Sequence, residues 1–334
     1  MPAPIIVTVY TRIAHFQRCI AALSANALAK ESELVVVSDA ASRTVDEEAV
    51  ANVRSYARQI SGFAKVTLIF RDRNLGMFAS ALDAIDSVLQ RYDRFIFLED
   101  DIVVANDFLD YMNRGLAFYE NHQDTVFSIC AFRIPFTFPR GWRDEMYFFP
   151  AHCPWGFATW RDRFLAVDFG MRNRYQEVID SPGYLSKAMS MGSHLLPILE
   201  ADSKGTYDAM DVRIVFHQIE RDMVSVFPRV SRSINIGCDG SGVHCGEMTD
   251  KPFESELAEG AAGVRFEPIV RVDERVVEAY RRYLDVGLIQ RGWRLARSAG
   301  PRVALERILR KLHQLSVRQL AVASRRVRRQ GHTP

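Results

Sequence analysis

Short apolar runs alternate with longer amphipathic stretches over the first 130 residues, and this alternation restricts the possible folds more than any other feature. The apolar runs cover residues 5–10, 34–37, 66–70 and 95–98. Each run is apolar almost throughout, which is typical of a strand that is buried on both faces. Between the runs, apolar residues recur at helical spacing, as they do over 76–89. The pattern predicts an α/β fold, with a mainly parallel sheet and helices on both of its faces.

Polar side chains follow each of the four apolar runs. Ligands of a parallel sheet bind at the carboxyl ends of its strands, so these side chains are the first candidates for a binding site. They are Thr11, Arg12, Ser38, Asp39, residues 71–74, and Glu99 to Asp101. The glycine-rich fingerprint of dinucleotide-binding folds and the Walker A phosphate loop are both absent from the sequence. The predicted sheet therefore binds a different kind of ligand.

Three adjacent carboxylates, Glu99, Asp100 and Asp101, come directly after the fourth apolar run. They repel one another, and placing them at the end of a buried strand is unfavourable unless a cation or a set of hydrogen-bond donors compensates. Mg²⁺ or Mn²⁺ is usually held by one or two carboxylates together with substrate phosphates, which suits this cluster. The alternative is a solvated acidic turn that caps a helix beginning near Asp107. The position after the fourth strand favours a metal and a nucleotide.

Four motifs, taken in their order along the chain, resemble those of GT-A glycosyltransferases. They are Val-Thr-Val-Tyr-Thr-Arg at 7–12, Val-Val-Ser-Asp at 36–39, Arg-Asn-Leu-Gly at 73–76 and Phe-Leu-Glu-Asp-Asp at 97–101. The chain is similar to bacterial family 2-like transferases, and also to N-acetylglucosaminyltransferase I, whose metal motif is Glu-Asp-Asp. The resemblance covers roughly residues 4–246. It implies a Rossmann-like, mixed but mainly parallel sheet in a metal-dependent enzyme that uses a nucleotide-sugar.

The resemblance also implies roles for individual residues on the donor side. Arg12 and Asp39 would hold the uracil, with the Asp39 carboxylate accepting a hydrogen bond from the base, and Glu99 would bind the ribose. Asp101 would be the direct metal ligand. The implied nucleotide-sugar set is Thr8, Tyr10, Arg12, Asp39, Arg73, Asn74, Glu99 and Asp100. Other interpretations stay open, namely a surface position for Arg12, a helix N-cap for Asp39 and a simple turn at 74–76.

An inverting transfer needs a general base on the acceptor side of the anomeric carbon, and two carboxylates are candidates for it. Asp208 and Asp211 stand near the start of a helix predicted at about 209–221. This segment resembles the catalytic segment of the family, which precedes a Pro-x-x-Ser-Arg stretch, here 228–232. The spacing makes Asp211 the nearer match and Asp208 the second. Alternatively, Asp208 caps the helix, and Asp211 pairs with Arg213 or stays exposed where the helix dipole favours a carboxylate.

Two later segments resemble further parts of the site of this family. Residues 234–244 resemble a loop that closes over the diphosphate, in which His244 would complete the metal shell. Residues 154–157 resemble the segment that lines the donor and acceptor pockets, so Trp155 and Gly156 are candidates for the sugar platform. An indole ring suits the flat C–H face of a pyranose. The alternatives are a surface position for His244 and core packing for Trp155.

The net charge of +2 conceals an uneven distribution of charge along the chain. Residues 281–330 contain fourteen basic side chains and two acidic ones, which leaves a net charge of −10 on the rest of the chain. An apolar stripe over 305–320 among these arginines is typical of a helix on an anionic membrane surface, where lipid-linked acceptors are found. Alternatively, this tail packs on the catalytic domain. Nucleic acid is excluded as a partner because recognised binding motifs are missing and the body is acidic.

The sequence predicts a cytoplasmic protein. Its five cysteines are an odd number without a Cys-x-x-Cys pair, which argues against a disulfide framework and against a zinc ribbon. No stretch approaches about 18 consecutive apolar residues, and the amino terminus does not resemble a signal peptide. We therefore expect a cytoplasmic location, with peripheral binding to the inner face of the plasma membrane through the basic tail.

Taken together, these patterns predict a catalytic domain over 1–265, with a nucleotide-sugar half at 1–132 and an acceptor half at 133–265. A basic, helical extension follows at 266–334. The predicted activity is that of an inverting glycosyltransferase that needs Mn²⁺ or Mg²⁺ and moves a sugar, most simply from a UDP-sugar. The acceptor is a glycan or a lipid-linked saccharide in bacterial polysaccharide biosynthesis. Two alternatives remain, a sugar-nucleotidyltransferase and a binding module that has lost catalysis.

Overall fold

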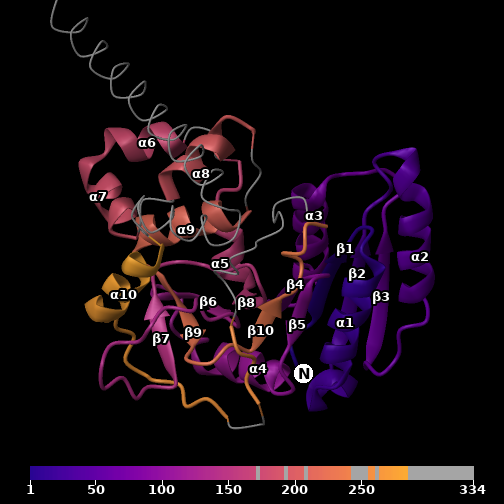
Figure 1. The fold of residues 1–334 in the computed structure, drawn as a ribbon, viewed down its shortest axis with the longest axis horizontal. Coiled ribbons are helices and arrows are strands. Elements are labelled where there is room, and N and C mark those ends of the chain that lie inside the picture. Colours follow the sequence, from indigo (N-terminus) through magenta and orange to yellow (C-terminus); the bar gives the residue numbers. More distant parts are fainter. Residues whose placement is uncertain (171–173, 192–194, 207–209, 242–254, 260–262, 285–334) are drawn as a thin grey trace, which may run out of the picture. The chain divides into compact units, whose positions relative to one another are not determined.

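A computed structural model describes residues 1–170, 174–191, 195–206, 210–241, 255–259 and 263–284. An eight-stranded sheet has the strand order β3-β2-β1-β4-β8-β6-β9-β7, and a second sheet pairs β10 with β5 (Figure 1). The strands are β1 (Ile5–Val9), β2 (Glu33–Ser38), β3 (Lys65–Phe70), β4 (Arg94–Glu99), β5 (Ile102–Val104), β6 (Val126–Cys130), β7 (Met146–Phe149), β8 (Phe157–Trp160), β9 (Val224–Pro228) and β10 (Ser233–Asn235).

Helices follow most of the strands in the first part of the chain and form a group of their own after β8. They are α1 (Ile13–Ser24), α2 (Glu47–Ala57), α3 (Met77–Leu89), α4 (Phe108–Phe118), α5 (Arg161–Leu165), α6 (Arg174–Asp180), α7 (Pro182–Ser190), α8 (Leu195–Ser203), α9 (Met210–Arg221) and α10 (Glu274–Leu284). Two short 3₁₀ helices cover Ala27–Glu31 and Thr44–Asp46. The helices predicted over 76–89 and 209–221 correspond closely to α3 and α9.

The four apolar runs form the parallel half of the large sheet. β1 lies between β2 and β4, and Ile5 is opposite both Leu34 and Ile96. β3 continues the parallel order beside β2, and β6 and β9 are parallel to each other. β8 runs antiparallel to both β4 and β6, and β7 runs antiparallel to β9. The sheet is therefore mixed and mainly parallel, which confirms the predicted class of fold.

Successive side chains of the central strands enter two different hydrophobic cores. Ile5 of β1 belongs to the core that contains Phe16 of α1, whereas Ile6 belongs to the core that contains Ile85 of α3. Because neighbouring side chains of a strand point to opposite faces, these cores lie on the two sides of the sheet. Residues of α1, α2 and α4 fill one core, and residues of α3 and α5 to α10 fill the other. Helices thus cover both faces, as the sequence predicts.

Several strands, β7 and β8 among them, and a group of helices were not expected from the sequence pattern. β7 and β8 lie in the aromatic and proline-rich stretch 132–160, and every residue of both strands is buried. A strand of four buried residues shows no alternation of polar and apolar side chains, so the two-residue period of a strand cannot be recognised in its sequence. Helices α6 to α8 likewise lack a strong pattern of their own, and α7 and α8 pack against α9.

Residues beyond the predicted division at 265 pack into the same cores as the rest of the described chain. Phe266 joins the core of α1 and α4, and Val276 and Tyr280 of α10 join the core of α3. The described residues thus show no change of core at 265, and the division into a catalytic domain and an extension stays a prediction. Residues 285–334, which hold the apolar and basic stripe, lie outside the described residues.

The lengths of the helices and the state of the cysteines bear on the expected environment of the protein. In the described part of the chain, no helix is long and apolar enough to span a membrane. Four cysteines, Cys19, Cys130, Cys153 and Cys238, are free thiols, and the first three of them are buried. The fifth, Cys245, lies outside the described residues.

Glu33, the first residue of β2, is a buried carboxylate surrounded by hydrogen-bond donors. Its oxygens accept hydrogen bonds from Tyr92 (2.5 Å), Thr67 (2.7 Å), Lys65 (3.1 Å) and Arg91 (3.2 Å). Burial works against the ionised form, but these four donors outweigh it and lower the pKa of Glu33 to about 2. The carboxylate therefore ties β2 to β3 and to the turn before β4.

Replacing Glu33 by glutamine is expected to lower the free energy of unfolding by about 1 to 3 kcal/mol at pH 7, the usual contribution of hydrogen bonds to a charged group. Because its folded pKa lies below the ordinary value of 4.5, the stabilisation is complete above that pH and is lost as the pH falls toward about 2. The difference between the two proteins in urea unfolding should therefore shrink on acidification. Glu31→Gln, at an exposed side chain, is the matched control. A difference that does not change with pH would contradict this role.

Candidate active site

The three adjacent carboxylates lie where β4 ends. Glu99 is the last residue of β4 and lies opposite Thr8 of β1. Asp100 and Asp101 form the turn between β4 and β5, and both are buried. Because parallel strands end at one edge of a sheet, the residues that follow β1, β2 and β3 reach the same edge as this acidic cluster.

Arg12 contributes a positive charge to the acidic cluster. It stands immediately before α1, and its Nη2 donates to Asp100 Oδ1 and lies 2.9 Å from Asp101 Oδ2. The interpretation of Arg12 as an ordinary surface residue is therefore wrong, since its side chain bridges two buried carboxylates. Its predicted contact with a nucleotide base stays a prediction.

One guanidinium group does not neutralise three carboxylates. Burial raises the pKa of Asp100 to about 6, although the charge and the hydrogen bond of Arg12 act in the opposite direction. Burial also raises the pKa of Glu99, and the negative charges of its neighbours, Asp211 among them, add to the effect. Glu99 nevertheless keeps part of its surface accessible. A further cation at this site would stabilise the ionised form of each carboxyl group.

A loop after β10 packs on the acidic cluster. The backbone N–H of Ile236 donates to the carbonyl oxygen of Asp101 over 2.9 Å. Further along, Asp239 Oδ2 lies 3.1 Å from His15 Nε2 of α1. Between these two contacts, Gly237 lies against Asp101, and a Cβ atom at this position would come within 2.8 Å of Arg12 Nη1. The glycine-rich composition of 234–244 points to such a close approach, but it does not single out Gly237.

If the site binds Mn²⁺ and UDP as the sequence predicts, replacing Gly237 by alanine is expected to weaken that binding by about tenfold, because the added methyl group displaces the side chains of Asp101 and Arg12. Overpacking of this kind costs about 1 to 3 kcal/mol. Calorimetric titration measures the affinity, and thermal unfolding checks that the variant is folded. Gly183→Ala is the matched control, since a Cβ atom at Gly183 has no other atom within 4 Å. Unchanged binding by the Gly237 variant would remove this loop from the site.

Asp39 follows β2 and holds the loop between β3 and α3. Its carboxylate accepts hydrogen bonds from the backbone N–H groups of Ala40 (2.9 Å), Leu75 (3.0 Å) and Gly76 (2.9 Å). The side chain of Asn74 donates to the carbonyl oxygen of Ala40 over 2.6 Å. Gly76 immediately precedes α3 and has a φ of 80°, which favours glycine. Asp39 thus fixes the loop that follows β3, although Asp39 itself follows β2. Its contact with a nucleotide base stays a prediction.

The other candidates for donor binding lie along the same edge of the sheet. The hydroxyl of Tyr10 donates to Asp46 Oδ2 over 3.0 Å and accepts a hydrogen bond from the backbone N–H of Ser42. The side chain of Arg73 is exposed, and Thr8 is partly exposed. The structure brings these residues to one edge, and their roles in binding a nucleotide-sugar stay predictions.

Asp211 lies in the first turn of α9 and is partly exposed. Besides burial, its negative charge contributes to the raised pKa values of Glu99 and Cys153. The carboxylate of α9 is therefore close enough to the acidic cluster to act on it electrostatically. Asp208 and His244, the other candidates for the base and for the metal shell, lie outside the described residues.

Arg213 of α9 is a contact residue for which the sequence provides no specific signal. Its Nε and Nη2 donate to the two carboxylate oxygens of Asp202 over 3.0 and 2.9 Å. Its Nη1 donates to the carbonyl oxygen of Phe169, and the guanidinium carbon lies 4.5 Å from the ring centroid of Phe78. These contacts join α9 to α8 and to the first turn of α3. The turn that carries Asp211 is therefore held by a buried ion pair.

Trp155 and Gly156 lie at the entry to β8. The ring of Trp155 is half-buried and packs edge-on against Phe132, with 4.7 Å between the ring centroids. Its carbonyl oxygen accepts a hydrogen bond from the hydroxyl of Ser233. Gly156 is buried with a φ of 88°, so the turn itself requires a glycine. Packing accounts for part of the Trp155 ring, and the role of both residues as a sugar platform stays a prediction.

The acidic cluster fits a divalent cation. Asp101 Oδ1 is buried and has no hydrogen-bond partner among the described residues, whereas Oδ2 contacts Arg12. Carboxylate oxygens are the ligands that Mg²⁺ and Mn²⁺ prefer, usually together with phosphate oxygens. Within the described ranges, no three His, Cys, Asp or Glu side chains are grouped so that they could hold a metal ion. A bound phosphate would therefore have to complete the coordination.

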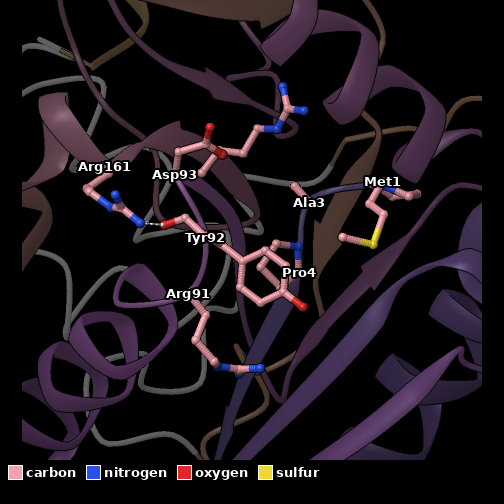
Figure 2. Close-up of a pocket in the computed structure, with 9 residues that line it drawn as sticks. Met1, Ala3, Pro4, Arg91, Tyr92, Asp93 and Arg161 are labelled. Carbon is pink, nitrogen blue, oxygen red and sulfur yellow. Dashed lines mark hydrogen bonds between the residues drawn. The ribbon is translucent and has the colours of Figure 1, made fainter.

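A cavity of about 390 Å³ lies at the opposite edge of the sheet (Figure 2). It is lined by Met1 to Pro4, Arg91 to Arg94 and Arg161. Arg161 Nη2 donates to the carbonyl oxygen of Tyr92 over 2.6 Å, as Figure 2 shows. Residues 1–4 and 91–94 precede or begin β1 and β4, and Arg161 follows β8, which runs antiparallel to β4, so the cavity lies at the amino ends of β1 and β4 and not beside the acidic cluster.

The fold and the site together define an α/β protein with a buried acidic cluster at the carboxyl edge of its parallel strands. Among solved structures, TarS from S. aureus is similar, with 12% identity over 72% of this chain and 38% of that chain, and a TM-score of 0.38. Residues 1–349 of TarS give 13% identity, 68% and 60% coverage, and a TM-score of 0.35. The chain thus spans less than two thirds of either TarS structure.

A third similar structure is the mannosyltransferase PcManGT from Pyrobaculum calidifontis, in complex with GDP-mannose and Mn²⁺. It has 16% identity over 66% of this chain and 75% of that chain, with a TM-score of 0.35. No family model matches the chain, and no curated protein matches it.

Proposed function

We propose that this chain is a metal-dependent, inverting glycosyltransferase of the GT-A type. It transfers a sugar from a nucleotide-sugar, with UDP-sugars as the first candidates, to a glycan or a lipid-linked saccharide in bacterial polysaccharide biosynthesis. One observation carries the proposal. The acidic cluster at the end of β4 contacts the guanidinium group of Arg12, and among the described residues the buried Asp101 Oδ1 has no hydrogen-bond partner. Such a cluster demands a cation, and a nucleotide diphosphate is the usual companion of that cation.

The loops around the acidic cluster support a nucleotide as the ligand. Asp39 fixes the loop that contains Arg73 and Asn74, so both lie at the carboxyl edge of the sheet where nucleotides bind in open α/β folds. Gly237 allows the backbone after β10 to approach Asp101 closely. A backbone without a side chain is what a phosphate-binding loop needs.

In the proposed reaction, Asp101 would hold a divalent cation, which would supply Lewis-acid stabilisation of the charge on the departing diphosphate. Asp211 accepts the proton of the attacking acceptor hydroxyl, which makes the oxygen a stronger nucleophile. The new bond from the anomeric carbon to this oxygen forms as its bond to the diphosphate oxygen breaks. Attack from the face opposite the leaving group inverts the anomeric configuration. Arg213 and Asp202 keep the first turn of α9 in place during this step.

The acceptor and the location of the enzyme are also part of the proposal. The basic tail at 281–330 would hold the enzyme on an anionic membrane, where a lipid-linked saccharide is presented. His244 would complete the metal shell, and Trp155 would support the sugar ring. With these additions, the protein is a cytoplasmic enzyme bound peripherally to the inner face of the plasma membrane.

A calorimetric screen of UDP-, GDP- and dTDP-sugars, each with and without Mn²⁺, tests the proposed function. We expect one nucleotide class to bind, and to bind in the presence of Mn²⁺ only. Release of UDP on addition of a saccharide acceptor would then identify a transferase. Release of pyrophosphate from a nucleoside triphosphate and a sugar phosphate would instead identify a nucleotidyltransferase, and saturable binding without turnover would identify a binding module.

A further inference from the structure

Arg12 contacts the same two aspartates that would lie beside a divalent cation at Asp101 Oδ1. Its Nη2 donates to Asp100 Oδ1 and lies 2.9 Å from Asp101 Oδ2. Both carboxylates are buried, so each needs a positive partner in any state in which it is ionised. A guanidinium group and a metal ion would therefore compete for the negative charge of the same two carboxylates.

We infer that Arg12 acts as an internal counter-cation of the metal site, so that the enzyme binds its metal tightly only together with the diphosphate of the donor. The inference rests on the proposed function and adds an order of binding to it. Arg12 leaves the carboxylates when the metal enters, and its guanidinium then pairs with the diphosphate. A guanidinium group suits this exchange because its planar set of donors matches phosphate as well as carboxylate.

The exposure of the side chains favours movement of Arg12 over movement of the aspartates. The Arg12 side chain is 20% exposed, whereas the side chain of Asp101 is 7% exposed and that of Asp100 is 5% exposed. Asp101 is also held through its backbone, since its carbonyl oxygen accepts a hydrogen bond from Ile236. The carboxylates are thus the fixed part of the site, and the arginine is the part with access to solvent.

The balance of charge explains why the metal alone binds weakly. While Arg12 stays on the cluster, its positive charge offsets part of the negative charge of the carboxylates and repels a divalent cation. Displacing it without a new anionic partner leaves a guanidinium group unpaired at the edge of the site, which costs free energy. The diphosphate removes this cost because it offers Arg12 a new partner and offers the metal further oxygen ligands.

Titration of the metal-free protein with Mn²⁺, followed by electron paramagnetic resonance of the free ion, tests the inference. We expect Arg12→Met to bind Mn²⁺ alone at least about tenfold more tightly than the unchanged protein does. We expect UDP to tighten Mn²⁺ binding strongly in the unchanged protein and only weakly in this variant. Arg12→Lys, which keeps the charge, should lie between the two. Arg18→Met is the matched control, because Arg18 is an exposed arginine on the same helix.

Two further results separate this inference from the proposed function. If Arg12→Met and the unchanged protein bind Mn²⁺ with equal affinity and respond equally to UDP, the inference is wrong while the metal site stands. If the unchanged protein binds no Mn²⁺ even with UDP, the proposed function fails and the inference fails with it. Asp101→Asn, introduced into the unchanged protein and into the Arg12→Met variant, should abolish Mn²⁺ binding. If these variants still bind Mn²⁺, the metal is held elsewhere and the inference is wrong.

Discussion

Replacing Asp101 by alanine is expected to reduce Mn²⁺-dependent transfer by at least about a thousandfold, since a bound cation contributes several kcal/mol to the stabilisation of a departing diphosphate. The substitution removes the buried Oδ1 atom, which has no hydrogen-bond partner in the described part of the chain, and the Oδ2 atom that contacts Arg12. UDP should also bind more weakly, because the metal no longer links the diphosphate to the protein. Turnover assays over a range of Mn²⁺ concentrations, together with calorimetry of UDP binding, measure both effects.

A matched control for this variant exists on the neighbouring helix. Asp110 of α4 is exposed and pairs with the exposed Arg114, so Asp110→Ala removes a carboxylate without touching the acidic cluster. Its transfer rate and its response to Mn²⁺ should equal those of the unchanged protein. Full Mn²⁺-dependent activity in Asp101→Ala itself would show that the metal is held by other residues.

Replacing Asp211 by asparagine is expected to lower the rate of transfer by about 10²- to 10⁴-fold, the usual contribution of a general base. Asparagine has nearly the same shape but cannot accept the proton of the acceptor hydroxyl. The affinity for the donor should change far less than the rate, because Asp211 stands on α9 and acts on the acidic cluster at the end of β4 through its charge. Product formation at saturating donor, compared with the donor affinity from calorimetry, separates these two effects.

The same assay on Asp208→Asn decides between the two candidate bases. If Asp211 is the base, the Asp208 variant should keep most of its transfer activity. Loss of transfer in Asp208→Asn combined with normal transfer in Asp211→Asn would move the base to Asp208. A weaker affinity for the donor in Asp211→Asn would instead indicate that this carboxylate belongs to the donor pocket.

The parallel half of the fold is visible in the sequence because each of its strands is a continuous apolar run with a helical stretch behind it. Ile5 and Ile6 show why a buried strand is recognisable in the sequence: they pack into the cores on opposite faces of the sheet, so both must be apolar. β7 and β8 could not be predicted in the same way, because a strand of four residues that are all buried shows no alternation. The difference lies in length, as a short strand offers too few residues for a pattern to emerge.

The sequence predicts those residues of the candidate site that directly follow a strand. The position of Glu99 to Asp101 at the edge of the sheet could be inferred from the run before it. The partner of Arg12 could not be inferred, because the sequence shows that a cation is needed but not which side chain provides it. Gly237 contacts Asp101 and Arg12, which are distant in the sequence, and Arg213 pairs with Asp202 of the preceding helix; the spacing of residues along the chain identifies neither contact.

The strand order determines which parts of the chain must be folded before the residues of the site come together. The chain proceeds outward from β1 to β2 and β3 and then returns to place β4 on the other side of β1. Arg12 and Asp100 are 88 positions apart in the sequence, and they meet because β1 and β4 are neighbours. A chain that ends before β4 contains none of the three carboxylates, and a chain without β1 has them without their guanidinium. The charges of this site are therefore balanced by the completed sheet and by no single segment of the chain.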